Sequence, residues 1–160
     1  RNPEARIVLR EACRVGDGPA GRNSGFMIDL PHDLSSGDYG GEAESDRRQI
    51  ALNRTAIDFA AEMAAEYGLS EEAFTRTGKL NAAATPKGTQ HNRDYAAHLA
   101  RIEETSEMLD AAQMQEITGT DYYESGLYTP GTAMIQPALY VRGMADGLRS
   151  TGCVCMKTRR

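Results

Sequence analysis

The sequence REACRVGDGPAGRNSGFMIDLPHDL, residues 10–34, is rich in turn-forming residues and follows the apolar run Ile7–Leu9, which has the composition of a β-strand. It contains Gly16–Gly21, GDGPAG, a match to the G-x-G-x-x-G pattern of dinucleotide-binding loops. In that motif the third glycine opens a helix whose amides hold a pyrophosphate. The residues after Gly21 have no amphipathic period, and Pro19 lacks the amide that such a loop uses. We therefore favour a glycine-rich loop after a strand, with a true dinucleotide loop as the alternative.

The same segment resembles a known family. Residues Arg6–Ala12, RIVLREA, and Gly18–Phe26, GPAGRNSGF, resemble the second strand and following loop of the D-amino-acid-oxidase-like FAD-dependent oxidoreductases. This superfamily includes glycine oxidase, sarcosine oxidase and γ-glutamylputrescine oxidase. In it, an acidic residue that ends the second Rossmann strand binds the FAD ribose, and Glu11 occupies that place. The resemblance implies FAD as the cofactor and a set of cofactor-binding residues: Glu11, Ala12, Gly21, Arg22, Asn23, Ser24 and Gly25.

The loop departs from the family pattern Ala-Ser-Gly-Arg-Asn-Gly-Gly at Pro19, Ala20 and Ser24. Ala20 therefore lacks the hydroxyl that the family's serine offers to a phosphate. The family's own G-x-G-x-x-G lies about 20 residues upstream of the ribose acid, whereas only ten residues precede Glu11. We therefore expect an internal fragment without the N-terminal G-x-G-x-x-G unit, and expect it to be inactive in isolation.

Charge and composition exclude several classes of protein. The net charge is −5, with 18 basic and 23 acidic residues and no basic stripe, which argues against nucleic-acid binding. No apolar run reaches the roughly 20 residues of a membrane span. Three cysteines, Cys13, Cys153 and Cys155, are odd in number, which favours a reducing, cytoplasmic setting. The pair Cys153 and Cys155 could form half of a metal site, but two thiolates do not complete one, and we favour buried, apolar roles for both. No metal site and no catalytic residue is predicted, and the oligomeric state stays open.

The rest of the chain predicts alternating helices and strands. Helical periodicity covers 42–67, with an apolar stripe made of Leu52, Ala56, Phe59, Ala60, Met63 and Tyr67 and a stop at Gly68. A strand is predicted over 73–84, with Gly78 as a bulge or close approach. Helices are expected after the caps Thr85–Pro86 and Asp110, and after Pro137, and a final strand over 153–156. Tyr95, Leu99 and Ile102 should be buried, whereas His91 and His98 should be solvated.

Two further segments carry the resemblance. Arg76–Leu80, RTGKL, is similar to a family strand, and Tyr122–Pro137 is similar to the family stretch around a hairpin; its three tyrosines either line a substrate pocket or are structural. His32, between Pro31 and Asp33, is near the flavin by resemblance but has no nucleophile to pair with.

Together these patterns predict an α/β fold of α+β character: a partial Rossmann-like FAD-binding segment and part of an antiparallel-sheet substrate domain with helices. The expected domains are a partial FAD-binding domain over 1–70, part of the substrate domain over 71–136, and a returning helix and strand over 137–160. By resemblance, the parent protein oxidises a small-molecule amine or amino acid to an imine by hydride transfer to the flavin. The alternative is a non-enzymatic, acidic, helix-rich interaction domain whose glycine-rich loop only joins elements.

Overall fold

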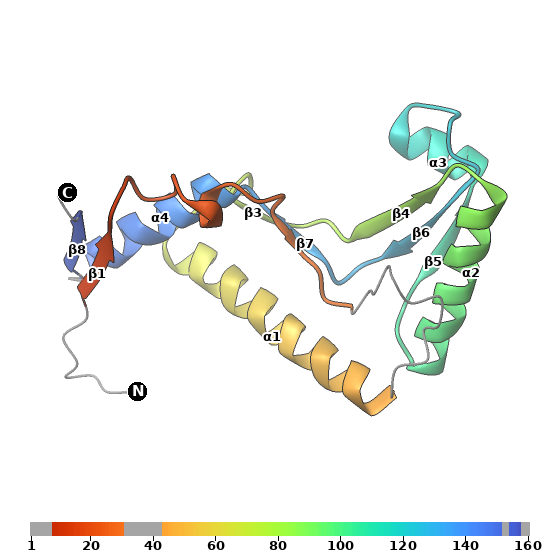
Figure 1. The fold of residues 1–160 in the computed structure, drawn as a ribbon, viewed down its shortest axis with the longest axis horizontal. Coiled ribbons are helices and arrows are strands. Elements are labelled where there is room, and N and C mark those ends of the chain that lie inside the picture. Colours follow the sequence, from red (N-terminus) through yellow and green to blue (C-terminus); the bar gives the residue numbers. More distant parts are fainter. Residues whose placement is uncertain (1–7, 31–42, 152–153, 158–160) are drawn as a thin grey trace. The chain divides into compact units, whose positions relative to one another are not determined.

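The computed structural model describes residues 8–30, 43–151 and 154–157 and confirms the predicted α/β class (Figure 1). In these ranges the helices are α1 (Ala43–Glu66), α2 (Pro86–Arg101), α3 (Ala111–Thr118) and α4 (Pro137–Ser150), with one short 3₁₀ turn, η1 (Pro19–Gly21). The strands are β1 (Val8–Glu11), β2 (Phe26–Met27), β3 (Phe74–Arg76), β4 (Lys79–Ala83), β5 (Glu107–Asp110), β6 (Ser125–Thr129), β7 (Ala133–Ile135) and β8 (Val154–Lys157). No helix within these ranges is both long and apolar enough to cross a bilayer.

The strands form three small sheets. β1 and β8 pair in parallel, with Val8 opposite Val154 and Glu11 opposite Lys157. A second sheet has the order β2-β7-β3, and a third, antiparallel sheet has the order β4-β6-β5. The single strand predicted over 73–84 is therefore wrong. The chain breaks at Gly78, whose φ of 71° is left-handed and whose amide donates to the carbonyl of Thr132 (2.9 Å), and β3 and β4 belong to different sheets.

The hairpin expected within 122–137 is also wrong. β6 pairs with β4 and β5, whereas β7 pairs with β2 and β3, so consecutive strands enter separate sheets.

The chain divides into two compact units. The first contains residues 1–26, 58–75 and 134–160, and the second contains residues 27–57 and 76–133. These boundaries describe contacts and say nothing of ligands, so the assignment of 1–70 and 137–160 to cofactor binding and of 71–136 to substrate binding stays a prediction.

Helix α1 forms where the sequence predicts it, but buries a different face. Ile50, Ile57, Ala60 and Ala64 are buried, whereas Leu52 and Phe59 are 58% and 55% exposed. Leu52 and Phe59 each follow a buried isoleucine by two positions, and two positions turn a helix by roughly 200°. The predicted stripe is therefore wrong at these two residues, which lie on the opposite side of the helix. It is also wrong at Ala56, which is exposed.

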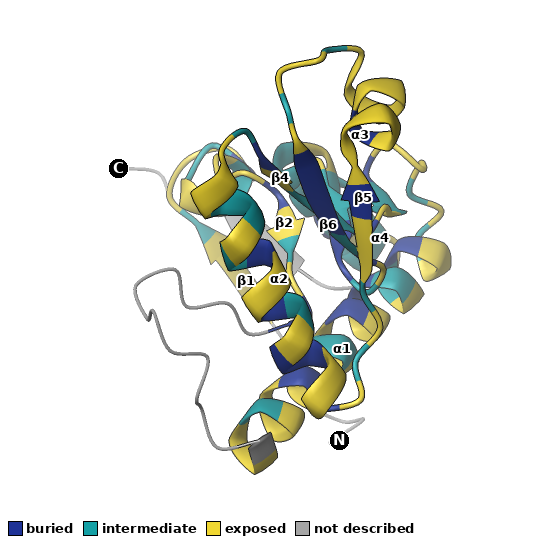
Figure 2. Ribbon diagram, turned by 90° about the vertical axis from the view of Figure 1, so that its right-hand side faces the viewer, coloured by how far each residue is buried: buried dark blue, intermediate teal, exposed yellow. Residues whose placement is uncertain are grey.

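Helix α2 begins at the predicted cap: Thr85 Oγ1 accepts from the amide of Gly88 (3.2 Å), and Pro86 is the first helical residue. Tyr95, Leu99 and Ile102 are buried as predicted, in a core that also contains Leu30, Ile50 and Leu127. Burial along α2 and β6 can be followed in Figure 2. The predicted solvation of His98 is wrong, because it is buried and its Nε2 lies 3.0 Å from Asp46 Oδ2 on α1.

Local signals also place α3 and α4 correctly. The side chain of Asp110 accepts from the amide of Gln113 while the Gln113 side chain accepts from the amide of Asp110, a complete capping box. Pro137 begins α4. Cys13 is a free, exposed cysteine. His32, Gly152 and Cys153 lie outside the described residues.

Candidate cofactor site

The expected ribose acid lies at the carboxyl end of a parallel strand. Glu11 ends β1, which pairs with β8, and its Oε1 accepts a hydrogen bond from the amide of Cys13 (2.9 Å). The Glu11 carboxylate is therefore held against the backbone of the turn that follows β1. Among the described residues nothing bonds to Oε2, so one oxygen of the half-buried side chain can accept from a hydroxyl. Ala12, the next predicted residue, is exposed.

The glycine-rich loop after Glu11 folds on itself. The amide of Gly21 donates to the carbonyl of Gly18 (3.0 Å) and the amide of Arg22 to that of Pro19 (3.1 Å), so the third glycine ends a 3₁₀ turn and does not open an α-helix. A Cβ at Gly21 would overlap the carbonyl of Gly16. The spacing of these glycines thus serves contacts within the loop, which supports the interpretation that the G-x-G-x-x-G match is no dinucleotide fingerprint.

Arg142 of helix α4 contacts this loop at two points. Arg142 Nε donates to the carbonyl of Val15 (3.2 Å), and Arg142 Nη2 forms an ion pair with Asp17 Oδ1 (3.2 Å). Both contacts are exposed, so each stabilises the loop only modestly. No local sequence pattern indicates the role of Arg142, because its partners lie more than 120 residues earlier.

Asn23 shapes the turn that follows. Its Nδ2 donates to the carbonyl of Ala20 (3.0 Å), and its Oδ1 accepts from the amide of Gly25 (2.9 Å). The side chain is therefore used inside the loop, whereas the structure shows no hydrogen-bond partner, among the residues it describes, for the amides of Asn23 and Ser24. Together with the exposed Ser24 hydroxyl and Arg22 guanidinium, these two amides are the donors available to an anionic ligand.

Gly25 has a structural reason to be glycine. Its φ is 79°, and a Cβ there would overlap the carbonyl oxygen of Ile135 on β7. Its carbonyl accepts from the amide of Ile135 (2.9 Å) and its amide is taken by Asn23. Gly25 therefore has no free backbone group for a cofactor in this arrangement, and its predicted contact with one stays a prediction.

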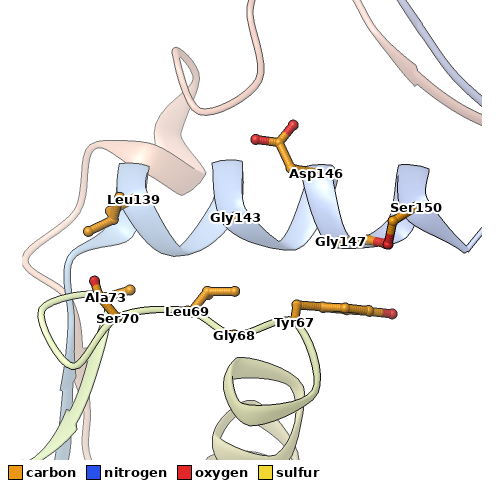
Figure 3. Close-up of a pocket in the computed structure, with 10 residues that line it drawn as sticks. All are labelled: Tyr67, Gly68, Leu69, Ser70, Ala73, Leu139, Gly143, Asp146, Gly147 and Ser150. Carbon is orange, nitrogen blue, oxygen red and sulfur yellow. The ribbon is translucent and has the colours of Figure 1, made fainter.

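A separate pocket of about 390 Å³ lies between residues 67–73 and α4 (Figure 3). Gly143 and Gly147 face Leu69 and Tyr67 so closely that a Cβ on either glycine would press into them. In Figure 3 the carboxylate of Asp146 points away from residues 67–73. The pocket lies where α4 packs closely against residues 67–73, and none of the predicted site residues lines it.

The residues around Glu11 fit the sugar and phosphate parts of a dinucleotide. A carboxylate with one free oxygen suits ribose hydroxyls, and two free amides with a neighbouring guanidinium suit an anion. Glu11 and the loop lie in one compact unit, and Gly21, Asn23 and Gly25 make contacts that hold the loop itself. Cofactor binding by these residues stays a prediction.

Comparison with known proteins gives the family. A model of the FAD dependent oxidoreductase (DAO) family matches residues 1–159. No curated protein sequence matches the chain. Among solved structures, glycine oxidase from Geobacillus kaustophilus is similar with a TM-score of 0.72 at 15% identity, over 95% of this chain and 40% of that one. Iminodiacetate oxidase from Chelativorans sp. BNC1 is similar with a TM-score of 0.70 at 14% identity, over 96% and 41%. L-amino acid deaminase from Proteus myxofaciens is similar with a TM-score of 0.69 at 10% identity, over 95% and 32%.

At these identities the structural likeness shows the fold alone, and this chain spans about 40% or less of the length of those three proteins. The family model, in contrast, matches nearly every residue. The chain therefore belongs to the family of FAD-dependent oxidoreductases.

Proposed function

We propose that the protein containing this chain oxidises an amine or amino acid to an imine, with FAD as the bound hydride acceptor. The observation that carries the proposal is the position of Glu11, at the carboxyl end of β1 in a parallel strand pair and directly before a glycine-rich loop. In α/β folds this is where nucleotide ligands bind. The glycine oxidase and iminodiacetate oxidase to which the fold is similar support the substrate class.

In this proposal the chain's own residues bind and orient the cofactor. The Glu11 carboxylate accepts from ribose hydroxyls through Oε2 while Oε1 keeps the amide of Cys13. The amides of Asn23 and Ser24, with the Arg22 guanidinium, balance phosphate charge. Asn23 keeps this turn rigid through its contacts to Ala20 and Gly25, which lowers the entropy lost on binding.

One face of the β4-β6-β5 sheet is suited to the substrate. Leu127 faces the core that contains Tyr95 and Leu99 of α2, so its strand neighbour Tyr128 points to the other face, opposite Leu80. The ring of Tyr128 covers Gly78, where a Cβ would come within 2.5 Å of the ring and the hydroxyl. We propose that Tyr128 and Leu80 line the substrate pocket, since they combine an apolar surface with one phenolic hydroxyl.

The test uses the full-length protein and FAD. We expect a yellow protein that binds FAD stoichiometrically and oxidises members of a panel of amines and amino acids, with release of peroxide or reduction of an added electron acceptor. Glu11→Ala should weaken FAD binding by about 1–3 kcal/mol, or roughly 5- to 150-fold, through loss of charge-assisted hydrogen bonds.

Two variants separate charge from shape. Glu11→Gln keeps an oxygen for the amide of Cys13 but loses the charge, and should weaken FAD binding nearly as much as Glu11→Ala. Glu62→Gln, on an exposed position of α1, is the matched control and should leave the dissociation constant unchanged. A protein that takes up no FAD and oxidises nothing in the panel would favour the non-enzymatic interaction domain. The cytoplasmic location stays a prediction.

A further inference from the structure

The segment from Ile135 to β8 contacts the segment from β1 to Gly25 at three places, in reverse order along the chain. The amide of Ile135 donates to the carbonyl of Gly25 (2.9 Å), Arg142 bonds to residues 15–17, and β8 pairs with β1. All of these residues lie in the first compact unit. The stretch that begins at Glu11 is therefore attached at both ends and at one point between them.

The middle attachment is made by Arg142. Its Nε donates to the carbonyl of Val15 (3.2 Å) and its Nη2 to Asp17 Oδ1 (3.2 Å), so one guanidinium bonds on both sides of Gly16. Gly16 is buried against α4, because a Cβ there would lie 3.2 Å from Arg142 Nε and 3.5 Å from the carbonyl oxygen of Ala138. A planar guanidinium presents its donors in a rigid fork. Arg142 therefore holds three consecutive residues of the loop.

Gly16 also contacts the far side of the loop. A Cβ at Gly21 would overlap the carbonyl of Gly16, so these two residues are packed backbone against backbone. Gly21 ends the turn η1, and Asn23 Nδ2 donates to the carbonyl of Ala20 in the same turn (3.0 Å). Direct contacts thus connect Arg142, through the two glycines and η1, to Asn23.

The spacing between two parts of the cofactor depends on this loop. In the proposed function Glu11 binds the ribose and the amides of Asn23 and Ser24 bind phosphate, with eleven residues between Glu11 and Asn23. Donors that are held in place before the ligand arrives lose less entropy on binding. The turn that carries them is exposed, whereas Gly16 and Gly25 on either side of it are buried. The contacts at these two glycines therefore set the position of the turn.

We propose that Arg142 is a positioning residue for FAD binding: it holds residues 15–17 against α4 and so keeps the Glu11 carboxylate and the amides of the following turn at a fixed spacing. This inference rests on the proposed function. It assigns Arg142 no contact with FAD or substrate. It also makes Asp17, a carboxylate in an anion-binding loop, favourable for binding because it holds Arg142.

The test compares FAD binding in variants of the full-length protein. Arg142→Ala removes both contacts, and Asp17→Ala removes one of them together with a negative charge. Arg149→Ala is the matched control, because Arg149 also lies on α4 and forms an exposed ion pair, with Asp146. The FAD dissociation constant is measured by flavin fluorescence at a temperature where circular dichroism shows each variant fully folded.

We expect Arg142→Ala to raise the FAD dissociation constant about three- to tenfold, Asp17→Ala about two- to threefold, and Arg149→Ala less than about 1.5-fold; these sizes are those of exposed, charge-assisted contacts. The direction of change for Asp17→Ala separates positioning from direct contact. If Arg142 bound a phosphate itself, loss of Asp17 would free the guanidinium and remove a like charge, and FAD would bind more tightly.

Loop order is measured separately, in protein without FAD. Trypsin cleaves after Arg14 and Arg22, which flank the held residues. Relative to cleavage elsewhere in the chain, cleavage at these two sites should be at least about threefold faster in Arg142→Ala and unchanged in Arg149→Ala, because local opening exposes a loop to proteases. A purely structural role instead predicts a lower melting temperature with an unchanged FAD dissociation constant, since apparent affinity falls only with the folded fraction.

Unchanged FAD binding in folded Arg142→Ala, tighter binding by Asp17→Ala, or unchanged cleavage after Arg14 and Arg22 would each overturn the inference. If Arg142→Ala does not fold, the direction of change for Asp17→Ala decides. Failure of the proposed function is distinguishable, because the unmodified protein would then bind no FAD.

Discussion

Gly25→Ala tests why the glycine-rich loop ends in glycine. The added Cβ meets two obstacles: a φ of 79°, and the carbonyl oxygen of Ile135. A left-handed conformation costs a residue with a Cβ roughly 1–2 kcal/mol, and forcing extra volume into a packed position costs about 1–3 kcal/mol. The added Cβ also lowers the conformational entropy of the unfolded chain, which stabilises the folded state by about 0.4–1 kcal/mol. We expect a net loss of about 2–4 kcal/mol in the free energy of unfolding.

Two other glycines separate these terms. Gly68 has a φ of 61° with nothing within 4 Å of its would-be Cβ, so Gly68→Ala carries the conformational cost alone, about 1 kcal/mol. Gly18 has a φ of −85° and the same open space, so Gly18→Ala should be neutral or stabilising by about 0.4–1 kcal/mol. Urea unfolding followed by circular dichroism gives all three values. A loss for Gly25→Ala no larger than that for Gly68→Ala would refute the steric part of the reasoning.

Three further predictions concern helices α3 and α1 and the half-buried Lys79. Asp110→Ala should lower the free energy of unfolding by about 1 kcal/mol, because α3 loses its N-cap. Asp110→Asn should lose much less, because asparagine also caps helices. Equal losses for the two variants in urea unfolding would contradict the capping role. Ile57→Ala should cost about 2–5 kcal/mol, while Phe59→Ala, on the exposed side of α1, should change stability by less than about 0.5 kcal/mol. Burial lowers the pKa of Lys79 in the folded protein below its ordinary value of 10.5, so the unfolded chain binds this proton more tightly. The contribution of Lys79 to the free energy of unfolding should therefore rise as the pH approaches 10.5 from below. Lys79→Met should lack this rise when unfolding is measured at neutral and at alkaline pH.

Sequence patterns were sufficient where the cause of structure is local. The ends of α2, α3 and α4 follow from Thr85–Pro86, Asp110 with Gln113, and Pro137, because each cap acts within three residues. The final strand and the α/β class were also predictable, and the family followed from Glu11 and the residues after it.

Features that depend on distant partners were not predictable. α1 carries apolar residues on two sides, and only the packed structure selects Ile50 and Ile57 over Leu52 and Phe59. The buried Asp29 pairs with Arg54, 25 residues later in the chain, and Arg54 also pairs with Glu104, 50 residues further on, so no local pattern identifies these contacts. His98 looked like a surface histidine for the same reason: its partner Asp46 is on another helix.

The pairing of β1 with β8 has a consequence for synthesis of the chain. Val154, the partner of Val8, is synthesised about 146 residues after it. At ordinary translation rates this is a delay on the order of 10 s. Residues 27–57 and 76–133, which form the second unit, are synthesised before Val154. During that interval the edge of β1 has no partner strand to its β8 side and is open to pairing with other chains, so aggregation of nascent protein should be most sensitive to the sequence of residues 8–11.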